Sequence, residues 1–133
     1  MRKDEISQLS YTIIGCAISV NKALGPGLLE SIYEKCLEYE LEKIGFSVKR
    51  QVPVSVVYDG LVFSHRLKVD LLVNDLVVLE LKAVEALLPI HEAQLLTYMK
   101  LLKCPQGLLI NFNTTNIVKS YVPLVNKFYE FET

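Results

Sequence analysis

The chain contains 133 residues, of which 51% are hydrophobic and 22% are charged. This length and composition predict one globular domain over residues 1–133 and exclude a second full domain. The formal net charge of −1 excludes the strong positive field of a protein that coats nucleic acid passively. It does not exclude an enzyme on nucleic acid, because bound divalent cations can supply the positive charge where a phosphate sits.

Composition also bears on the cellular compartment. No apolar run approaches the roughly 18 residues of a membrane span, and the N-terminal residues do not form a signal-peptide core. We therefore expect a cytoplasmic protein with no membrane partner. The three cysteines, Cys16, Cys36 and Cys104, are odd in number and include no CxxC pair, which argues against a disulfide scaffold and a zinc ribbon.

Two helices are predicted in the first third of the chain. Apolar residues recur at helical spacing over residues 4–24, where Asp4 can cap the start and the Gly-Pro-Gly segment at 25–27 must end the helix. A second helical pattern covers residues 28–44 and ends at Gly45, a residue typical of C-terminal caps. We expect the two to form a helical hairpin.

The rest of the chain predicts a central sheet with one further helix. β-branched residues and alternation indicate strands, and Asp59-Gly60 is a strong hairpin turn signal. In order, the predicted elements are a strand at 48–57, a strand at 61–73, a strand at 77–84, a helix from Pro89 to about Lys103, a strand at 108–112 and a weaker strand near 117–122. The order ααβββαβ(β) predicts an α/β domain with a central sheet.

Charged side chains share faces of two predicted strands. Period-2 alternation places Arg66, Lys68 and Asp70 on one face of the strand at 61–73, together with Val62, Ser64 and Leu72. On the strand at 77–84, Glu80 and Lys82 share a face, so an acid and an ammonium group project together from a very apolar strand.

Whether the two carboxylates meet depends on the turn between the strands. A two-residue loop would put Asp70 and Glu80 on opposite faces of the sheet. A three-residue loop at 74–76 would pair Val73 with Val77 and set Asp70 directly across from Glu80. We predict the three-residue loop or a bulge of the same parity.

Two carboxylates at cross-strand distance repel each other unless a cation or a proton lies between them. Ligation by oxygen atoms alone suits Mg²⁺ or Mn²⁺ rather than zinc. A lysine two residues further on can orient an attacking water or neutralise a reacting phosphate. The alternative is a salt-bridged pair at a strand end, and a lone Glu-x-Lys pattern favours that alternative.

Acidic residues also fall on the apolar stripe of the second predicted helix. At 100° per residue, Glu30 lies between Leu37 and Leu41, and a carboxylate there needs a partner. With Gly27 as N-cap, Glu30 would be the third helical residue and would stabilise the free amides and the helix dipole. Glu40 falls on the same stripe, so the spacing leaves the two acids, and the cap and active-site interpretations, open.

Three polar residues share an arc of the third predicted helix. His91, Gln94 and Tyr98 lie within about 60° of one another, among apolar residues, so this face is expected to pack on another element. Their hydrogen-bonding groups then need partners. A core network and a role in catalysis are both compatible with the pattern, and the convergence of three such groups favours the second.

These residues together resemble a known family. The segment from Gly27 to Tyr33, GLLESIY, matches the signature that names the GxxExxY proteins. The later residues Asp70, Glu80-Leu81-Lys82 and Gln94 with Tyr98 resemble the D, ExK and QxxxY motifs of the PD-(D/E)XK nuclease superfamily. The match extends from the first helix to Asn111-Phe112, and the order of elements is also the superfamily's. The resemblance implies a restriction-endonuclease-like core, a central mixed β-sheet flanked by helices.

The resemblance further implies a metal-dependent phosphodiesterase acting on nucleic acid, with DNA favoured over RNA. By analogy, Asp70, Glu80 and the backbone carbonyl of Leu81 would bind Mg²⁺ or Mn²⁺, with Glu30 joining directly or through a water. Lys82 would position the nucleophilic water, and Gln94 and Tyr98 would help to place Lys82 or the scissile phosphate. The predicted catalytic set is therefore Glu30, Asp70, Glu80, Lys82, Gln94 and Tyr98.

We expect a basic approach for the nucleic acid beside this site. Arg66 and Lys68 share the face of Asp70, whereas alternation lets at most one of Lys49 and Arg50 join them. His91 is a further expected contact. The alternative is a solvated strand end that contributes little to binding.

Two classes of function remain open at this stage. The first is a Mg²⁺-dependent nuclease, which the set of two acids and a lysine favours. The second is a non-catalytic binding or regulatory module with a nuclease-like fold, acting with a protein partner or as a homodimer. The small size and the lack of a DNA-recognition domain favour the second class, or a partner that supplies specificity. A two-carboxylate glycosidase fits poorly, because tryptophan is absent and no aromatic sugar platform is visible.

Overall fold

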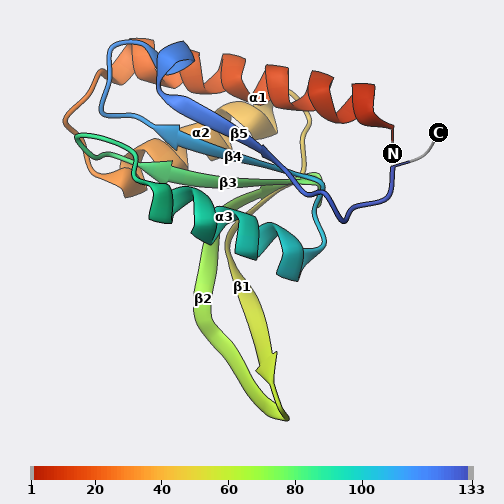
Figure 1. Cartoon of the computed structure of the whole chain (residues 1–133). Coiled ribbons are helices and arrows are strands. Elements are labelled where there is room, and N and C mark those ends of the chain that lie inside the picture. The colour runs from red at the N-terminus through yellow and green to blue at the C-terminus, as the bar shows by residue number, and fades with distance from the viewer. Residues whose placement is uncertain (1, 132–133) are drawn as a thin grey trace.

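The computed structural model describes residues 2–131 as a five-stranded sheet with helices on both faces (Figure 1). The elements are α1 (Lys3–Leu24), α2 (Glu30–Lys43), β1 (Val48–Tyr58), β2 (Leu61–Val73), β3 (Val77–Lys82), α3 (Pro89–Leu102), β4 (Gln106–Asn111), the 3₁₀ helix η1 (Ile117–Lys119) and β5 (Tyr121–Val125). The strands lie in the order β1-β2-β3-β4-β5. Neighbouring strands are antiparallel except β3 and β4, which run parallel with α3 as the crossover.

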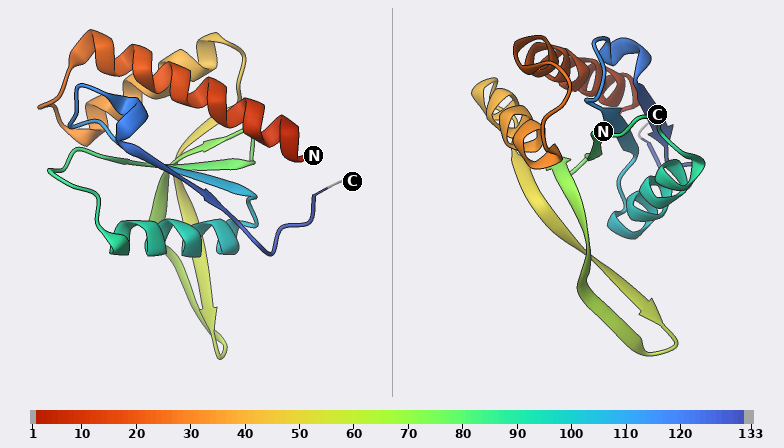
Figure 2. Two further views of the ribbon diagram at one scale, coloured as in Figure 1. Left: turned by 45° about the horizontal axis from the view of Figure 1, so that its top comes forward. Right: turned by 90° about the vertical axis from the view of Figure 1, so that its left-hand side faces the viewer.

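The sheet separates two apolar cores. Helices α1 and α2 cover one face, where Tyr33, Leu37 and Leu41 pack with alternate residues of the sheet. Helix α3 covers the other face and packs through Leu95 and Met99. Figure 2 shows the same three layers. The predicted α/β class and central mixed sheet flanked by helices are confirmed.

Both helix starts differ from the prediction. Helix α1 has Arg2 at its N-cap position, and Asp4 lies in the first turn, where it pairs with Arg2 at 3.3 Å. Helix α2 has Leu29 rather than Gly27 as its N-cap, so Glu30 is the first helical residue and not the third. The expected caps at Asp4 and Gly27 were therefore wrong.

Tyr33 explains where α2 begins. Its hydroxyl donates to the carbonyl of Gly25 at 2.6 Å and accepts from the backbone N–H of Leu28 at 3.1 Å. These two bonds keep the segment between the helices in a loop, in which Gly25 and Gly27 have φ values of 71° and 101°. Such values favour glycine, so this loop requires both glycines.

The C-terminal strands are displaced from the prediction by a few residues. Strand β3 ends at Lys82 rather than 84, because the Asn111 side chain binds both backbone groups of Val84 and holds it away from the ladder. Strand β4 covers 106–111 instead of 108–112. The segment at 117–119 forms η1, whose buried Ile117 packs against α1, and β5 follows at 121–125.

The hairpin of β1 and β2 extends well beyond the rest of the molecule (Figures 1 and 2). We call its outer part, residues 55–68, the hairpin arm. All its residues are exposed except the half-buried Val56. The pairing changes register between Val54 and Val56, and His65 has a φ of 64°. This bulge means that the predicted alternation is not continuous from Val62 to Asp70, although it still relates Arg66 and Lys68.

Within residues 2–131, no helix combines the length and the apolar character that crossing a membrane requires.

Candidate metal and catalytic site

The turn between β2 and β3 has the predicted register. Val73 pairs with Val77, Leu72 with Val78 and Leu71 with Leu79, so the loop has three residues. Its residues Asn74 and Asp75 have φ values of 53° and 56°, a conformation that Asn and Asp tolerate better than most residues. The choice of this loop over a two-residue loop is confirmed.

Beyond Leu71 the two strands separate, and the Asp70 carboxylate occupies the gap. Its Oδ2 atom accepts a hydrogen bond from the backbone N–H of Leu81 at 2.8 Å. Asp70 therefore lies against the segment that carries Glu80 and Lys82. The carboxylates of Asp70 and Glu80 are close enough for Asp70 to raise the pKa of Glu80.

Glu80 is the most perturbed acid of the site. The residue is only 6% exposed, and its Oε1 atom is buried with no hydrogen-bond partner among the described residues. Burial and, second to it, the neighbouring Asp70 carboxylate raise the pKa of Glu80 to about 8, and the Lys82 ammonium group opposes this shift. A buried carboxylate oxygen without a donor is costly, so this atom is poised to accept a proton or a cation.

Lys82 lies at the end of β3, where β4 holds the backbone. Its carbonyl accepts from the N–H of Phe112 at 2.8 Å. Asn111, the residue before Phe112, is 5% exposed. Its side-chain oxygen accepts from the backbone N–H of Val84 at 3.1 Å, and its side-chain nitrogen donates to the carbonyl of Val84 at 2.9 Å. Asn111 thereby fixes the chain directly after Lys82. No local pattern in the sequence indicates this positioning role.

Helix α3 contributes Tyr98, which is 5% exposed. Burial raises the pKa of its hydroxyl, Glu80 and Asp70 raise it too, and the Gln94 side chain opposes the shift. Tyr98 thus lies near enough to Glu80 and Asp70 to sense their charge. Gln94 itself is exposed rather than packed. It lies one turn nearer the N-terminus of α3 than Tyr98.

His91 has a local structural role. Its Nδ1 atom accepts from the backbone N–H of Leu88 at 3.0 Å, which caps the start of α3. The residue is half-buried. Its expected contact with nucleic acid stays a prediction, available only to the other ring nitrogen.

Helix α2 brings Glu34, and not Glu30, to this group of residues. Glu30 is exposed, and no side-chain hydrogen bond or ion pair within residues 2–131 involves it. Glu34 is 5% exposed and binds Arg50 Nε at 2.9 Å and Gln51 Nε2 at 2.9 Å. Burial raises the pKa of Glu34, the bond from Arg50 lowers it, and Asp70 raises it. Glu40, the other acid that the helical spacing placed on the apolar stripe, forms an ion pair with Lys43.

Gln51 connects Glu34 with Asp70. Its Nε2 atom also lies 3.5 Å from Asp70 Oδ1, so one amide group donates toward both carboxylates. The backbone of Gln51 has a φ of 51° within a strand, which is uncommon for a residue with a side chain. Strain of this kind is frequent at functional sites, where neighbouring contacts hold it in place.

The sequence held a signal for Glu34 but none for Gln51. At 100° per residue Glu34 lies about 20° from Leu41, as near to the apolar stripe as Glu30. The wheel gives angles and cannot show that the helix begins at Glu30, one turn before the packed region. The left-handed backbone of Gln51 has no sequence signature.

The expected basic approach is partly neutralised. Lys49 pairs with Asp75 at 2.7 Å, and Arg50 pairs with Glu34. In the part of the chain that the structure describes, Arg66 and Lys68 form no ion pair; the Arg66 guanidinium lies 5.5 Å from the centre of the Phe63 ring. The two cations of β2 are therefore the free members of this cluster.

The side chains alone do not complete a metal site. Among residues 2–131, no three His, Cys, Asp or Glu side chains gather in an arrangement that would hold a metal ion. Asp70 and Glu80 supply two carboxylates, and any further ligands would come from backbone carbonyls or water. Oxygen donors of this kind are ligands that Mg²⁺ accepts in proteins.

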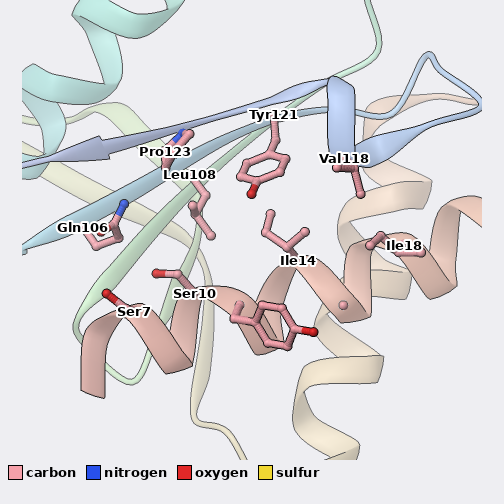
Figure 3. Close-up of a pocket in the computed structure, with 11 residues that line it drawn as sticks. Ser7, Ser10, Ile14, Ile18, Gln106, Leu108, Val118, Tyr121 and Pro123 are labelled. Carbon is pink, nitrogen blue, oxygen red and sulfur yellow. The ribbon is translucent and has the colours of Figure 1, made fainter. Parts of the chain in front are cut away.

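A separate groove lies beside α1, away from the candidate site. Figure 3 shows it between α1 and the strands β4 and β5, with Ile14, Tyr121 and Pro123 among the labelled residues. Its volume is about 560 Å³, and its lining is mostly apolar. None of the candidate catalytic residues lines this groove.

Comparisons with known proteins identify the superfamily and a similar fold. A family model described as the PD-(D/E)XK nuclease superfamily matches residues 7–122. The protein of the "Crystal structure of SSO0001" has a similar fold, with a TM-score of 0.55 and 20% sequence identity. The similarity covers 72% of this chain and 49% of that one, so the chain spans about half the length of that protein. No curated protein matches the chain.

Proposed function

Because the chain belongs to the PD-(D/E)XK nuclease superfamily, we propose that it is a Mg²⁺- or Mn²⁺-dependent nuclease that hydrolyses phosphodiester bonds of nucleic acid. Among nucleic acids, we propose DNA as the substrate. The segment from Gly27 to Tyr33 further supports a place among the GxxExxY proteins.

The observation that carries the proposal is the unpartnered, buried Oε1 atom of Glu80 beside Asp70. Burying an acid next to another acid costs stability, and the fold has no side-chain donor for this atom among the described residues. A divalent cation between the two carboxylates would remove both costs. A surface that only binds other molecules has no need of such an arrangement.

The donor set fits a hard cation. Oxygen atoms of Asp70, of Glu80 and of the Leu81 backbone carbonyl would hold it, and hard oxygen ligands suit Mg²⁺ and Mn²⁺. When bound, the metal would polarise a phosphoryl oxygen and offset the negative charge that develops in hydrolysis. No further cysteine or histidine is needed.

Lys82 is the residue of this chain that supplies positive charge at the site. Its side chain is half-buried and acts on Glu80, so it lies beside the carboxylates. There the ammonium group can orient the attacking water and neutralise charge on the phosphate. Asn111 and Phe112 fix the backbone at Lys82 through the bonds described above, which keeps the ammonium group in place.

Tyr98 and Gln94 form the wall of the site on the side of α3. The raised pKa of Tyr98 keeps its hydroxyl protonated, so it can donate a hydrogen bond to a carboxylate or a phosphate oxygen. Gln94 is exposed beside it and can contact the substrate directly. Both roles place the residues around the reacting group.

For the third carboxylate we propose Glu34 in place of Glu30. Glu34 is buried and is joined to Asp70 through the Gln51 amide, whereas Glu30 is exposed. Glu34 would orient the Asp70 carboxylate through the Gln51 amide. Comparing Glu34→Gln with Glu30→Gln tests this choice, because only the first should reduce cleavage.

The test of the function is cleavage of labelled duplex and single-stranded DNA and RNA with Mg²⁺, Mn²⁺ or chelator. We expect metal-dependent cleavage that falls by at least about a hundredfold in Asp70→Asn and in Lys82→Ala. The matched control is Asp75→Asn, which removes an exposed carboxylate near the same turn and should retain activity. Equal cleavage by the wild type and by Asp70→Asn would reveal a contaminating nuclease, and binding without cleavage would identify a non-catalytic module.

A further inference from the structure

We propose that the hairpin arm is a clamp that lies in a groove of double-stranded B-form DNA beside the active site. This inference rests on the proposed function and adds the form of the substrate and the surface that grips it. It is carried by the shape of the arm, by its charges and by its connection to Asp70.

The shape of the arm is that of a free two-stranded ribbon. Thirteen of its fourteen residues are exposed, and Val54, immediately before it, is the last fully buried residue of β1. Within the described residues the two strands of the arm pair only with each other, which leaves both faces of the ribbon open to a partner. The major groove of B-DNA admits a two-stranded ribbon, whereas the major groove of A-form RNA is too narrow for side chains to read.

The charges of the arm favour nucleic acid over a second copy of the chain. Arg66 and Lys68 make no ion pairs within the described residues, and the one acid of the arm, Asp59, lies at the far turn. The chain as a whole has a net charge of −1, so two free cations on one strand are a local feature. A second copy of the same arm would bring like charges together. The phosphates of a nucleic acid would instead neutralise Arg66 and Lys68.

The tip of the arm is apolar. Val57, Tyr58, Leu61 and Val62 are between 58% and 71% exposed. Apolar side chains of this kind contact base edges or wedge between base steps when a protein grips duplex DNA. Stacking on a single strand uses a series of aromatic rings, whereas the arm has only Tyr58 free for it, because the Arg66 guanidinium lies over the Phe63 ring.

The arm is continuous with the active site. Arg66 and Lys68 precede Asp70 on β2 by four and two residues, and the tip precedes it by nine. At about 3.3 Å per residue, the cations lie about 13 and 7 Å along the strand from Asp70, and the tip about 30 Å. With about 3.4 Å per base pair, the arm reaches some nine base pairs from the position of Asp70.

Two sets of variants test the clamp. The first is Arg66→Gln with Lys68→Gln, and its matched control is Lys119→Gln with Lys127→Gln, which removes two exposed lysines at the other end of the sheet. The second shortens the arm by replacing residues 56–65 with Asn-Gly, a two-residue turn that joins Ser55 to Arg66. Because only the half-buried Val56 and exposed residues are removed, the cores stay intact, which thermal unfolding checks.

Binding is measured with fluorescent blunt DNA duplexes of 6–24 base pairs in chelator, so that cleavage plays no part. We expect the Arg66/Lys68 double variant to bind about tenfold more weakly at 0.1 M salt, with a salt slope shallower by about 1.8. The control pair should change affinity by less than about twofold. The shortened arm should reach its full affinity on duplexes about five base pairs shorter than the wild type requires.

The outcomes separate this inference from the proposed function. Arm-dependent duplex binding without any metal-dependent cleavage supports the clamp and refutes the nuclease. Cleavage with unchanged salt slope and unchanged length dependence in both arm variants refutes the clamp and leaves the nuclease. Equal or tighter binding to single strands or to duplex RNA, or dissociation of a dimer by arm shortening with DNA binding intact, also overturns it.

Discussion

Glu80 shows how one buried oxygen couples the chemistry of the site to the stability of the fold. Its pKa is raised from an ordinary value of 4.5 to about 8, chiefly by burial and then by Asp70. Between these two values the folded protein keeps a proton that the unfolded chain has released. The free energy of unfolding therefore falls as the pH rises through this window.

We predict that the metal-free protein is more stable at pH 5 than at pH 8.5, and that Glu80→Gln removes about 4 kcal/mol of this difference. The glutamine is neutral at every pH, so the variant should be the more stable protein at pH 8.5. Urea unfolding in chelator at both pH values measures the effect. Glu85→Gln, at an exposed position of the following loop, is the control and should keep the wild-type difference. An unchanged pH dependence in Glu80→Gln would contradict the raised pKa.

Tyr33 is the residue that fixes the loop before α2. Its hydroxyl has two backbone partners, Gly25 and Leu28, and its ring stacks on Phe112 at a centroid distance of 4.7 Å. Removing the hydroxyl leaves both backbone groups without this partner but keeps the ring packing. The residue therefore stabilises the loop through its polar atom and the core through its ring.

We predict that Tyr33→Phe lowers the free energy of unfolding by about 2 kcal/mol, the cost of two lost hydrogen bonds in a partly buried loop. Tyr39→Phe is a matched control, because Tyr39 lies on the same helix, is 63% exposed and should change stability by less than about 0.5 kcal/mol. Urea unfolding of both variants measures the difference. Equal effects from the two substitutions would mean that the Tyr33 hydroxyl does not hold the loop.

At the scale of elements, Gly107 sets how closely α3 approaches β4. A Cβ atom at this position would lie 2.5 Å from Met99 Sδ and 3.1 Å from two side-chain atoms of Leu95. Both side chains are fully buried, so they have little room to move. The helix that carries Tyr98 and Gln94 therefore owes its position to the absence of a side chain on β4.

We predict that Gly107→Ala destabilises the fold by about 2 kcal/mol and lowers metal-dependent cleavage, because α3 must shift and carry Tyr98 with it. Gly15→Ala is the control: a Cβ there meets nothing within 4 Å, and an alanine within α1 should stabilise the protein by about 0.5–1 kcal/mol. Adding Met99→Ala should make Gly107→Ala less costly than it is alone. Purely additive effects in that double variant would rule out the contact.

The elements also show what sequence patterns can and cannot predict. Apolar spacing and β-branched alternation predicted the helices and strands, and turn length with alternation predicted the register that pairs Val73 with Val77. Tertiary packing determined the features that these patterns did not predict. The helical wheel selected Glu30 and Glu40, although Glu34 lies equally near the apolar stripe, and only the start of α2 against the sheet separates these acids. The bulge at His65 and the backbone of Gln51 depend on tertiary contacts that leave no local pattern.

At the scale of the whole molecule, the site joins parts that belong to both faces of the sheet. Glu34 comes from the side of α1 and α2, Tyr98 from the side of α3, and Asp70 and Glu80 from the strands between them. They meet where the hairpin leaves the sheet. A cation bound there would link the two layers, so its binding should be felt by the entire fold.

Ligand binding to the folded state alone raises stability by an amount set by concentration and affinity. We predict that Mg²⁺ or Mn²⁺ at ten times its dissociation constant stabilises the protein by about 1.4 kcal/mol at pH 8, and raises the unfolding temperature by about 5 °C. Asp70→Asn and Glu80→Gln should abolish the increase, whereas Asp75→Asn should retain it. Thermal unfolding monitored by circular dichroism, with KCl at matched ionic strength, measures the shift. An equal rise in Glu80→Gln would mean that the cation binds elsewhere, because the carboxylate whose charge it should balance would then be dispensable.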